Sequence, residues 1–212
     1  MRRMLLGSAA AAVVLITGTV SAAQAHDGSG LGAVRAATAA FHNIAVAEQH
    51  GYGLLADANG IACIDMPGMG GMGVHWADPD LVADGQIRAR APEALVYAPD
   101  RDGTLVLAAV EYVVLRADWD GAHRRPPALF GRSFDVTAAP NRFGLPAYYS
   151  LHAWVWKPNP AGRFAMYNPR VTCPSGSPTR HVHPAAASNY QDMLDLHALK
   201  TRFAALQRGQ RR

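Results

Sequence analysis

Sequence patterns that reveal the common catalytic classes are lacking in this chain. It has no G-x-S-x-G motif of serine hydrolases, no phosphate-binding P-loop and no H-E-x-x-H zinc motif. Charge is also scarce, because Asp, Glu, Lys and Arg make up 17% of the 212 residues while 50% are apolar. This composition excludes a disordered, highly charged chain and favours one compact globular domain, but it names no reaction.

Long apolar runs are lacking except at the N-terminus, which excludes a polytopic membrane protein. There, Arg2 and Arg3 precede an apolar segment over residues 4–20, and Ala23 and Ala25 form a small-residue cleavage pattern. Such an order is typical of a secretory signal peptide. The sequence therefore predicts a signal peptide over residues 1–25 and a secreted or periplasmic mature protein with no transmembrane segment. An uncleaved membrane anchor is the alternative.

Cysteine is scarce too, with Cys63 and Cys173 as the two in the chain. Because an exported protein leaves the reducing cytosol, we expect a disulfide bond between them. The alternative is a pair of metal-binding thiolates, but the close C-x-x-C spacing of most such sites is missing.

The order of patterns along the mature chain predicts an α+β fold, with an antiparallel sheet, an N-terminal helix packed on it and an appended C-terminal helix. Apolar residues at helical spacing predict the first helix over 31–51, with Gly51 as its stop. We expect one domain over 26–173. A Pro-, Ser- and Ala-rich linker over 174–187 and an amphipathic helix with a basic tail over 188–212 follow it.

Three segments predict the main strands of the sheet. Residues 94–97 and 105–115 flank a turn rich in Pro, Asp and Gly and predict a hairpin. Residues 147–156, dense in aromatic and β-branched side chains, predict a central strand. A shorter strand is expected over 129–134, whereas 66–73 and 118–128 are expected to be loops.

Strand alternation singles out three polar residues as a candidate metal site. Glu111 interrupts an apolar row that the alternation assigns to residues 105, 107, 109, 113 and 115, and His152 lies in an aromatic row of the strand over 147–156. His75 lies in a third short extended segment. Two histidines and one carboxylate match the ligand types of divalent transition-metal sites. The alternative is that all three are core residues paired with other protein groups.

The segment over 66–73 adds two sulfur ligands to this hypothesis. Met69 and Met72 lie among glycines close to His75, and thioethers prefer Cu(I), so copper is one candidate metal beside other divalent transition metals. Alternatively, flexible methionines fill the edge of the core. Cleavage after Ala25 would also make His26 the N-terminal residue, where it could bind Cu(II) as one arm of a histidine brace.

Several segments resemble a family of uncharacterised secreted bacterial proteins. They are GMGGMGVHW (68–76), EALVY (93–97), VEYVV (110–114) and LHAWVWKPNP (151–160), followed by Asn168-Pro169 and Cys173. The resemblance spans roughly residues 36–173. It implies one exported domain ending near the second cysteine and carries no established activity, so it assigns no catalytic residues.

These patterns support a secreted domain that binds a metal or a small ligand. One alternative is a non-catalytic domain that binds a cell-envelope or protein partner through an exposed aromatic face of Tyr148, Trp154, Trp156 and Tyr167. A second is a metal-dependent oxidoreductase. We expect no nucleic-acid partner, whereas the basic C-terminus (Lys200, Arg202, Arg208, Arg211 and Arg212) is a candidate contact with the cell envelope.

Overall fold

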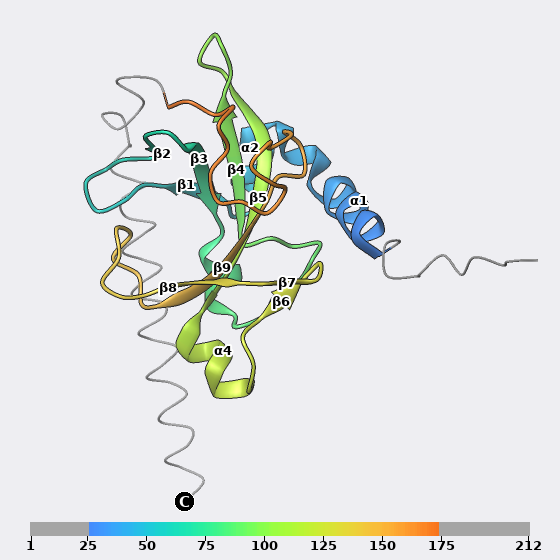
Figure 1. Cartoon of the computed structure of the whole chain (residues 1–212), viewed down its shortest axis with the longest axis vertical. Helices are drawn as coiled ribbons and strands as arrows, with labels where there is room; N and C mark the ends of the chain where they lie inside the picture. Colours follow the sequence, from blue (N-terminus) through green and yellow to red (C-terminus); the bar gives the residue numbers. More distant parts are fainter. Residues whose placement is uncertain (1–25, 174–212) are drawn as a thin grey trace, which may run out of the picture.

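The computed structural model describes residues 26–173, which form an α+β fold around one antiparallel sheet (Figure 1), as the sequence predicts. The strands of this sheet run in the order β1-β3-β4-β5-β9-β8, and β2 also pairs with β3. Their bounds are Gly53–Leu55 (β1), Cys63–Met66 (β2), Gly70–Ala77 (β3), Ala94–Pro99 (β4), Leu105–Leu115 (β5), Asp135–Thr137 (β8) and Tyr148–Ala153 (β9).

The signal peptide over 1–25, the linker over 174–187 and the C-terminal helix with its basic tail over 188–212 lie outside the described residues and stay predictions. Within 26–173, the helices are too short or too polar to cross a membrane.

The predicted N-terminal helix is broken into three pieces rather than continuous. These are α1 (His26–Thr38), the 3-10 helix η2 (Ala39–His42) and α2 (Ile44–Gln49). The break lies at Asn43, whose extended backbone (φ −92°, ψ 111°) lets its side chain accept a hydrogen bond from the Ala45 N–H and cap α2. The chain leaves α2 through Gly51 at φ 96°, which agrees with the predicted stop.

The predicted hairpin is confirmed as β4 and β5, but its register contains an irregularity that the sequence pattern does not reveal. Val96 pairs with Ala109, whereas its neighbour Tyr97 pairs with Leu107. The extra residue in β5 turns Leu107 to the opposite face from Ala109. The predicted apolar row from 105 to 115 is therefore wrong in its first part, since Leu107 packs with Tyr97 and away from Glu111.

Other elements differ from the sequence-based expectation in length and type. The strand expected over 129–134 is a two-stranded hairpin, β6 (Ala128–Leu129) and β7 (Arg132–Ser133), turned by Phe130 and Gly131 at positive φ. A helix, α4 (Arg116–Ala122), occupies the first part of the expected loop over 118–128. The short helix α3 (Pro79–Ala83) is capped at its N-terminus by the carboxylate of the preceding residue, Asp78.

The two faces of the sheet carry different layers. On one face the largest core cluster joins Leu31 and Val34 of α1 to Leu95, Val110 and Tyr112 of the sheet. The opposite face carries two smaller clusters, one around Val113 and Tyr148 and one around Val96 and Trp154. Figure 1 shows α1 and α2 on one side of the long strands.

The predicted disulfide is confirmed. Cys63 in β2 is bonded to Cys173, the last described residue, with an S–S distance of 2.08 Å. The bond joins two positions 110 residues apart, so it ties the last described residue to strand β2 of the sheet.

Candidate metal centre

Three neighbouring parts of the sheet bring His75, Glu111 and His152 together. Glu111 in β5 lies directly opposite His152 in β9. On its other side Glu111 lies opposite Ala94 in β4, and Ala94 in turn pairs with Ala77, two residues after His75 in β3. His75 itself lies opposite Val96 in β4, and its ring reaches past this strand to Glu111.

The three side chains present their ligand atoms to one another in the protein interior. The Nε2 atoms of His75 and His152 are 3.2 Å apart, and His75 Nε2 is 3.2 Å from Oε2 of Glu111. One ligand atom from each residue fits within 4.8 Å of the others. Relative exposures of 2%, 9% and 4% for His75, Glu111 and His152 show that bulk water does not surround them.

The two distances from Nε2 of His75 match those between ligands of one metal ion. With metal–nitrogen bonds of about 2.0–2.1 Å, two ligands of a tetrahedral ion are roughly 3.4 Å apart, and two at a right angle are roughly 2.9 Å apart. The spacing of 3.2 Å lies between these values. The ligand atoms of His152 and Glu111 lie within 4.8 Å of each other, so the three side chains could hold a first-row transition ion.

The protonation states also suit cation binding. Burial alone would raise the pKa of Glu111, but the hydrogen bond with His75 and the charge of the neighbouring imidazoles outweigh it and lower this pKa to about 2. Burial lowers the pKa of His152 to about 4, and the attraction of Glu111 opposes that shift only in part. At neutral pH the site therefore holds a carboxylate beside a neutral imidazole, and both are forms that bind metals.

The fold leaves this cluster incompletely hydrogen-bonded. Within residues 26–173, Nδ1 of His75 and Nδ1 of His152 are buried without a partner. If His75 donates its Nε2 proton to the cluster, a neutral His152 accepts through Nε2 and must carry its own proton on the unpartnered Nδ1. An unsatisfied buried N–H costs about 1–3 kcal/mol, so packing of the core alone does not account for this arrangement.

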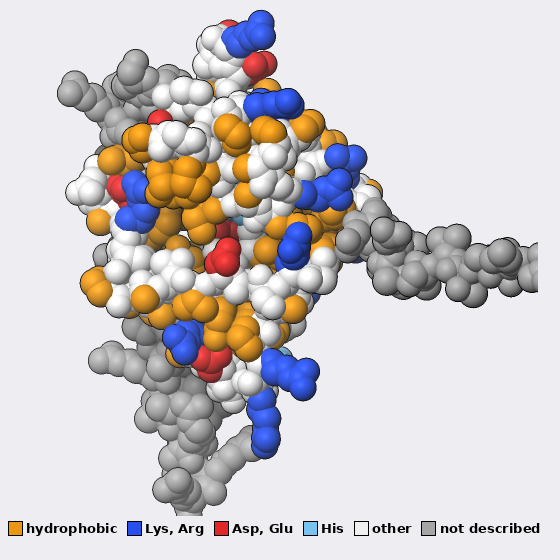
Figure 2. Space-filling model, viewed as in Figure 1, with side chains coloured by type: hydrophobic (Ala, Val, Ile, Leu, Met, Phe, Trp, Pro, Cys, Tyr) orange, Lys and Arg blue, Asp and Glu red, His pale blue; other side chains and the backbone are white. Residues whose placement is uncertain are grey.

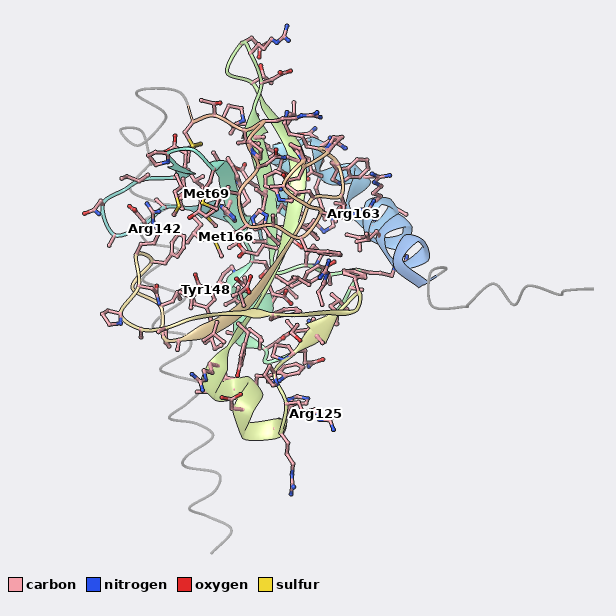
Figure 3. The ribbon with its side chains drawn as sticks, in the orientation of Figure 1. Met69, Arg125, Arg142, Tyr148, Arg163 and Met166 are labelled. Atoms are coloured by element: carbon pink, nitrogen blue, oxygen red, sulfur yellow. A yellow bond between two sulfur atoms is a disulfide. The ribbon has the colours of Figure 1, made fainter. Side chains whose placement is uncertain are left out.

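A cavity of about 290 Å³ opens beside the cluster and reaches Glu111. Ser150, two residues before His152 in β9, lines it and hydrogen-bonds Glu111. Figure 3 labels three further lining residues, Arg142, Tyr148 and Met166, which come from separate segments of the chain. On the face seen in Figure 2, hydrophobic side chains gather around an acidic centre.

The two methionines of the hypothesis lie in different surroundings. The predicted loop over 66–73 is a hairpin between β2 and β3, with Met69 half exposed at its tip. Met72 is buried in β3 and lines the cavity. Gly73 allows this placement, because its φ of 98° redirects the strand and a Cβ there would lie 2.7 Å from the Tyr97 carbonyl oxygen.

The aromatic face of the partner-binding alternative does not form as that alternative expects. Tyr148 and Trp154 are buried, at 7% and 3% exposure. β9 ends at Ala153, and Trp156 lies with the helices, where its Nε1–H donates to the Thr38 hydroxyl. Tyr167 is partly buried and lines the cavity.

Sequence reasoning missed Ser150, Glu93 and the pair formed by Arg142 and Asp57. The alternation of side chains along the strand could have indicated Ser150, since it lies on the same strand face as His152. Glu93 is fully buried, its Oε2 accepts a hydrogen bond from the Val113 N–H, and burial raises its pKa to about 8. The Arg142–Asp57 pair joins loops 85 residues apart, and no sequence spacing indicates it.

Comparison with protein-family models, curated proteins and solved structures finds no match to this chain.

Proposed function

We propose that this protein binds a divalent transition metal through Nε2 of His75, Nε2 of His152 and the carboxylate of Glu111. The observation that carries the proposal is the convergence of these atoms from β3, β5 and β9 at ligand-to-ligand spacing in a buried site. The alternative of core residues paired with other protein groups accounts for Glu111, which contacts His75 and Ser150, but not for the two buried Nδ1 atoms that have no partner among the described residues.

The ligand set favours zinc, copper(II), iron(II) or nickel, since imidazole suits all four and one carboxylate is common to their sites. A copper(I) site would need soft thioether ligands as well. Met69 is half exposed at the hairpin tip, so the structure offers no support for it as a ligand of a buried ion. Met72 stays on the cavity wall beside the site.

The proposal places this metal-binding domain outside the cytosol. The disulfide between Cys63 and Cys173 supports an oxidising compartment, since such bonds rarely persist in the cytosol. The signal-peptide pattern and the resemblance to secreted bacterial proteins point to the same compartment. The same proposal includes a contact between the basic C-terminus and the cell envelope.

Metal analysis tests the proposal directly. Protein purified without a histidine tag is reconstituted with zinc, copper(II) or iron(II), freed of excess ion and analysed for bound metal. We expect close to one ion per chain in the wild type and loss of that ion in a His75→Ala/His152→Ala variant. The matched control is His50→Ala/His123→Ala, which removes two exposed histidines and should keep the ion. A wild type that binds no metal, or a control that loses it equally, contradicts the proposal.

The cavity favours a second candidate, a metal-dependent oxidoreductase. Two histidines and one carboxylate leave coordination positions free for oxygen and a substrate, and the cavity ends at one of the three ligands. Nitric oxide, which binds iron(II) where oxygen does, should give a paramagnetic adduct with the iron-loaded protein. An iron-loaded protein that binds no nitric oxide contradicts this second candidate and leaves metal binding intact.

A further inference from the structure

We infer that the cavity beside Glu111 binds a small organic molecule with an apolar body and one hydrogen-bond-donating head group, an ammonium or a hydroxyl, which meets the Glu111 carboxylate. This site takes a different ligand from the proposed metal site, although the two share Glu111.

The walls of the cavity define the apolar body of the ligand. They are formed mainly by hydrophobic side chains that converge from separate segments of the chain, among them Leu55, Met72, Val82, Val113, Phe143 and Leu145. Five of these six are at most 8% exposed, so they form a fixed lining rather than a mobile surface patch. Apolar walls with few polar groups are typical of pockets for small molecules.

The size of the cavity limits the ligand. Its volume of about 290 Å³ is roughly twice that of an engineered apolar cavity of about 150 Å³ that binds benzene. A single aromatic ring with a short side chain fits such a space, whereas a sugar chain or a peptide does not.

The polar end of the cavity defines the head group. Glu111 and Ser150 lie there together, and the Glu111 side chain is 11% exposed. A carboxylate can accept about four hydrogen bonds. His75 and Ser150 use part of this capacity, so Glu111 can still accept from a ligand. Because Oε2 faces His75, the same carboxylate can ligate an ion on that side and accept a hydrogen bond from the cavity.

An anionic head group does not suit this site. Arg142 is the cation on the cavity wall, and its guanidinium is already bound to Asp57, with Nη2 2.8 Å and Nε 3.3 Å from Oδ2. Asp57 also accepts hydrogen bonds from the N–H groups of Asn59 and Ile61, which fix the pair in place. The charge of Arg142 is therefore neutralised, and an anionic ligand would meet the Glu111 carboxylate without compensation.

Three probes with the same aromatic body test the head group: 2-phenylethylamine, 2-phenylethanol and phenylacetate. Their affinities are measured by calorimetry on the full chain at one pH, first in the presence of a chelator and then with zinc. We expect the amine and the alcohol to bind the metal-free protein at least about tenfold more tightly than phenylacetate, the difference that one charge-assisted hydrogen bond supplies. Equal or tighter binding of phenylacetate, or no binding of any probe, overturns the inference.

Two variants locate the binding. Glu111→Gln should weaken binding of the amine to the metal-free protein about tenfold, because it removes the charge from the acceptor. Leu145→Trp should abolish binding of all three probes by filling the cavity. Met166→Trp, on the same wall, replaces it if the first variant does not fold. Val106→Trp, at an exposed position, is the matched control and should bind as the wild type does. Unchanged binding in a folded cavity-filling variant overturns the inference.

The zinc-loaded protein separates this inference from the proposed function. If zinc does not bind but the order of probes holds, the metal proposal fails and the cavity inference stands. If phenylacetate binds tightly with zinc alone and is released by the chelator, the head group is a metal ligand. That result overturns the inference while supporting the metal site.

Discussion

The two faces of the sheet bury polar groups in different ways. On the helix-covered face, tyrosine hydroxyls donate to backbone carbonyls: Tyr52 to Pro92, Tyr97 to Phe41 and Tyr112 to Ala89. On the opposite face, Nδ1 of His75 and Nδ1 of His152 have no partner in the part of the chain that the structure describes, and the two rings lie beside the buried Glu111 carboxylate. On the first face, each of these buried tyrosine hydroxyls has a hydrogen-bond acceptor, as the stability of the fold requires.

The difference supports the proposal that the cluster binds a metal ion rather than serving stability alone. A buried ion pair is often no more stabilising than well-packed apolar residues of similar volume. Glu93, which lies close to Tyr52 and Tyr112, is the exception on the helix-covered face, because its Oε1 has no partner within residues 26–173.

Removal of the disulfide should give the largest loss of stability. The cluster of His75, Glu111 and His152 should still bind a metal ion. Cys63→Ala/Cys173→Ala should lower the free energy of unfolding by about 4–5 kcal/mol, since the bond closes a long loop in the unfolded chain. Urea unfolding measures the loss, and metal content measures the site. A loss below about 1 kcal/mol would show that the bond contributes little to the domain.

Truncation in the helix-covered core should be the next largest effect. Leu95 is fully buried in β4 and packs with Trp76 and Tyr97, so Leu95→Ala should cost about 2–5 kcal/mol. The exposed Val106→Ala in the same hairpin is the matched control, with an expected change within about 0.5 kcal/mol. Urea unfolding measures both variants. Similar losses for the two would contradict the placement of the core.

Glu93 should make the stability depend on pH. Because its folded pKa of about 8 lies above the unfolded value of 4.5, its contribution is greatest below about pH 4.5 and falls by up to about 1.4 kcal/mol per pH unit until about pH 8. Glu93→Gln cannot ionise and should lack this fall.

The measurement compares urea unfolding of wild type and Glu93→Gln at about pH 5 and about pH 8. His152 titrates in the opposite sense, since its lowered pKa removes stability as the pH falls below 6.5, and the difference between the two proteins cancels this effect. Parallel pH profiles would mean that Glu93 is ionised in the folded protein.

Replacement of the whole cluster by apolar residues should have the smallest effect on stability. We expect His75→Leu/Glu111→Leu/His152→Leu to change the free energy of unfolding by less than about 1 kcal/mol or to raise it. The single variant His75→Leu removes the imidazole that pairs with the buried Glu111 carboxylate and should lower the free energy of unfolding by about 3–5 kcal/mol. Thermal and urea unfolding compare the two. A triple variant less stable than the single one would show that the cluster is structural.

The fold class could be predicted from the sequence, because the periodicities of strands and helices are local properties. The hairpin of β4 and β5 and the disulfide follow from residues that are adjacent in sequence or unique in the chain. The irregular pairing at Val96 and Tyr97 does not, since an extra residue in β5 has no distinctive side chain. The break at Asn43 was missed because apolar spacing continues on both sides of it.

The candidate site was predicted in residue type but not in arrangement. Alternation alone marks Glu111 and His152 as polar residues in apolar rows, but their separation in space depends on the pairing of β5 with β9. The cavity depends on side chains from separate segments, among them Leu55, Phe143 and Met166. No local sequence pattern predicts that these side chains lie together, because their arrangement depends on the tertiary fold.

Anomalous diffraction from crystals grown with zinc or copper(II) tests the central claim most directly. The account predicts one strong peak between β3, β5 and β9, about 2.0–2.2 Å from His75 Nε2, His152 Nε2 and a Glu111 oxygen. A peak confined to exposed histidines such as His123, or no peak at the cluster under saturating metal, would contradict it.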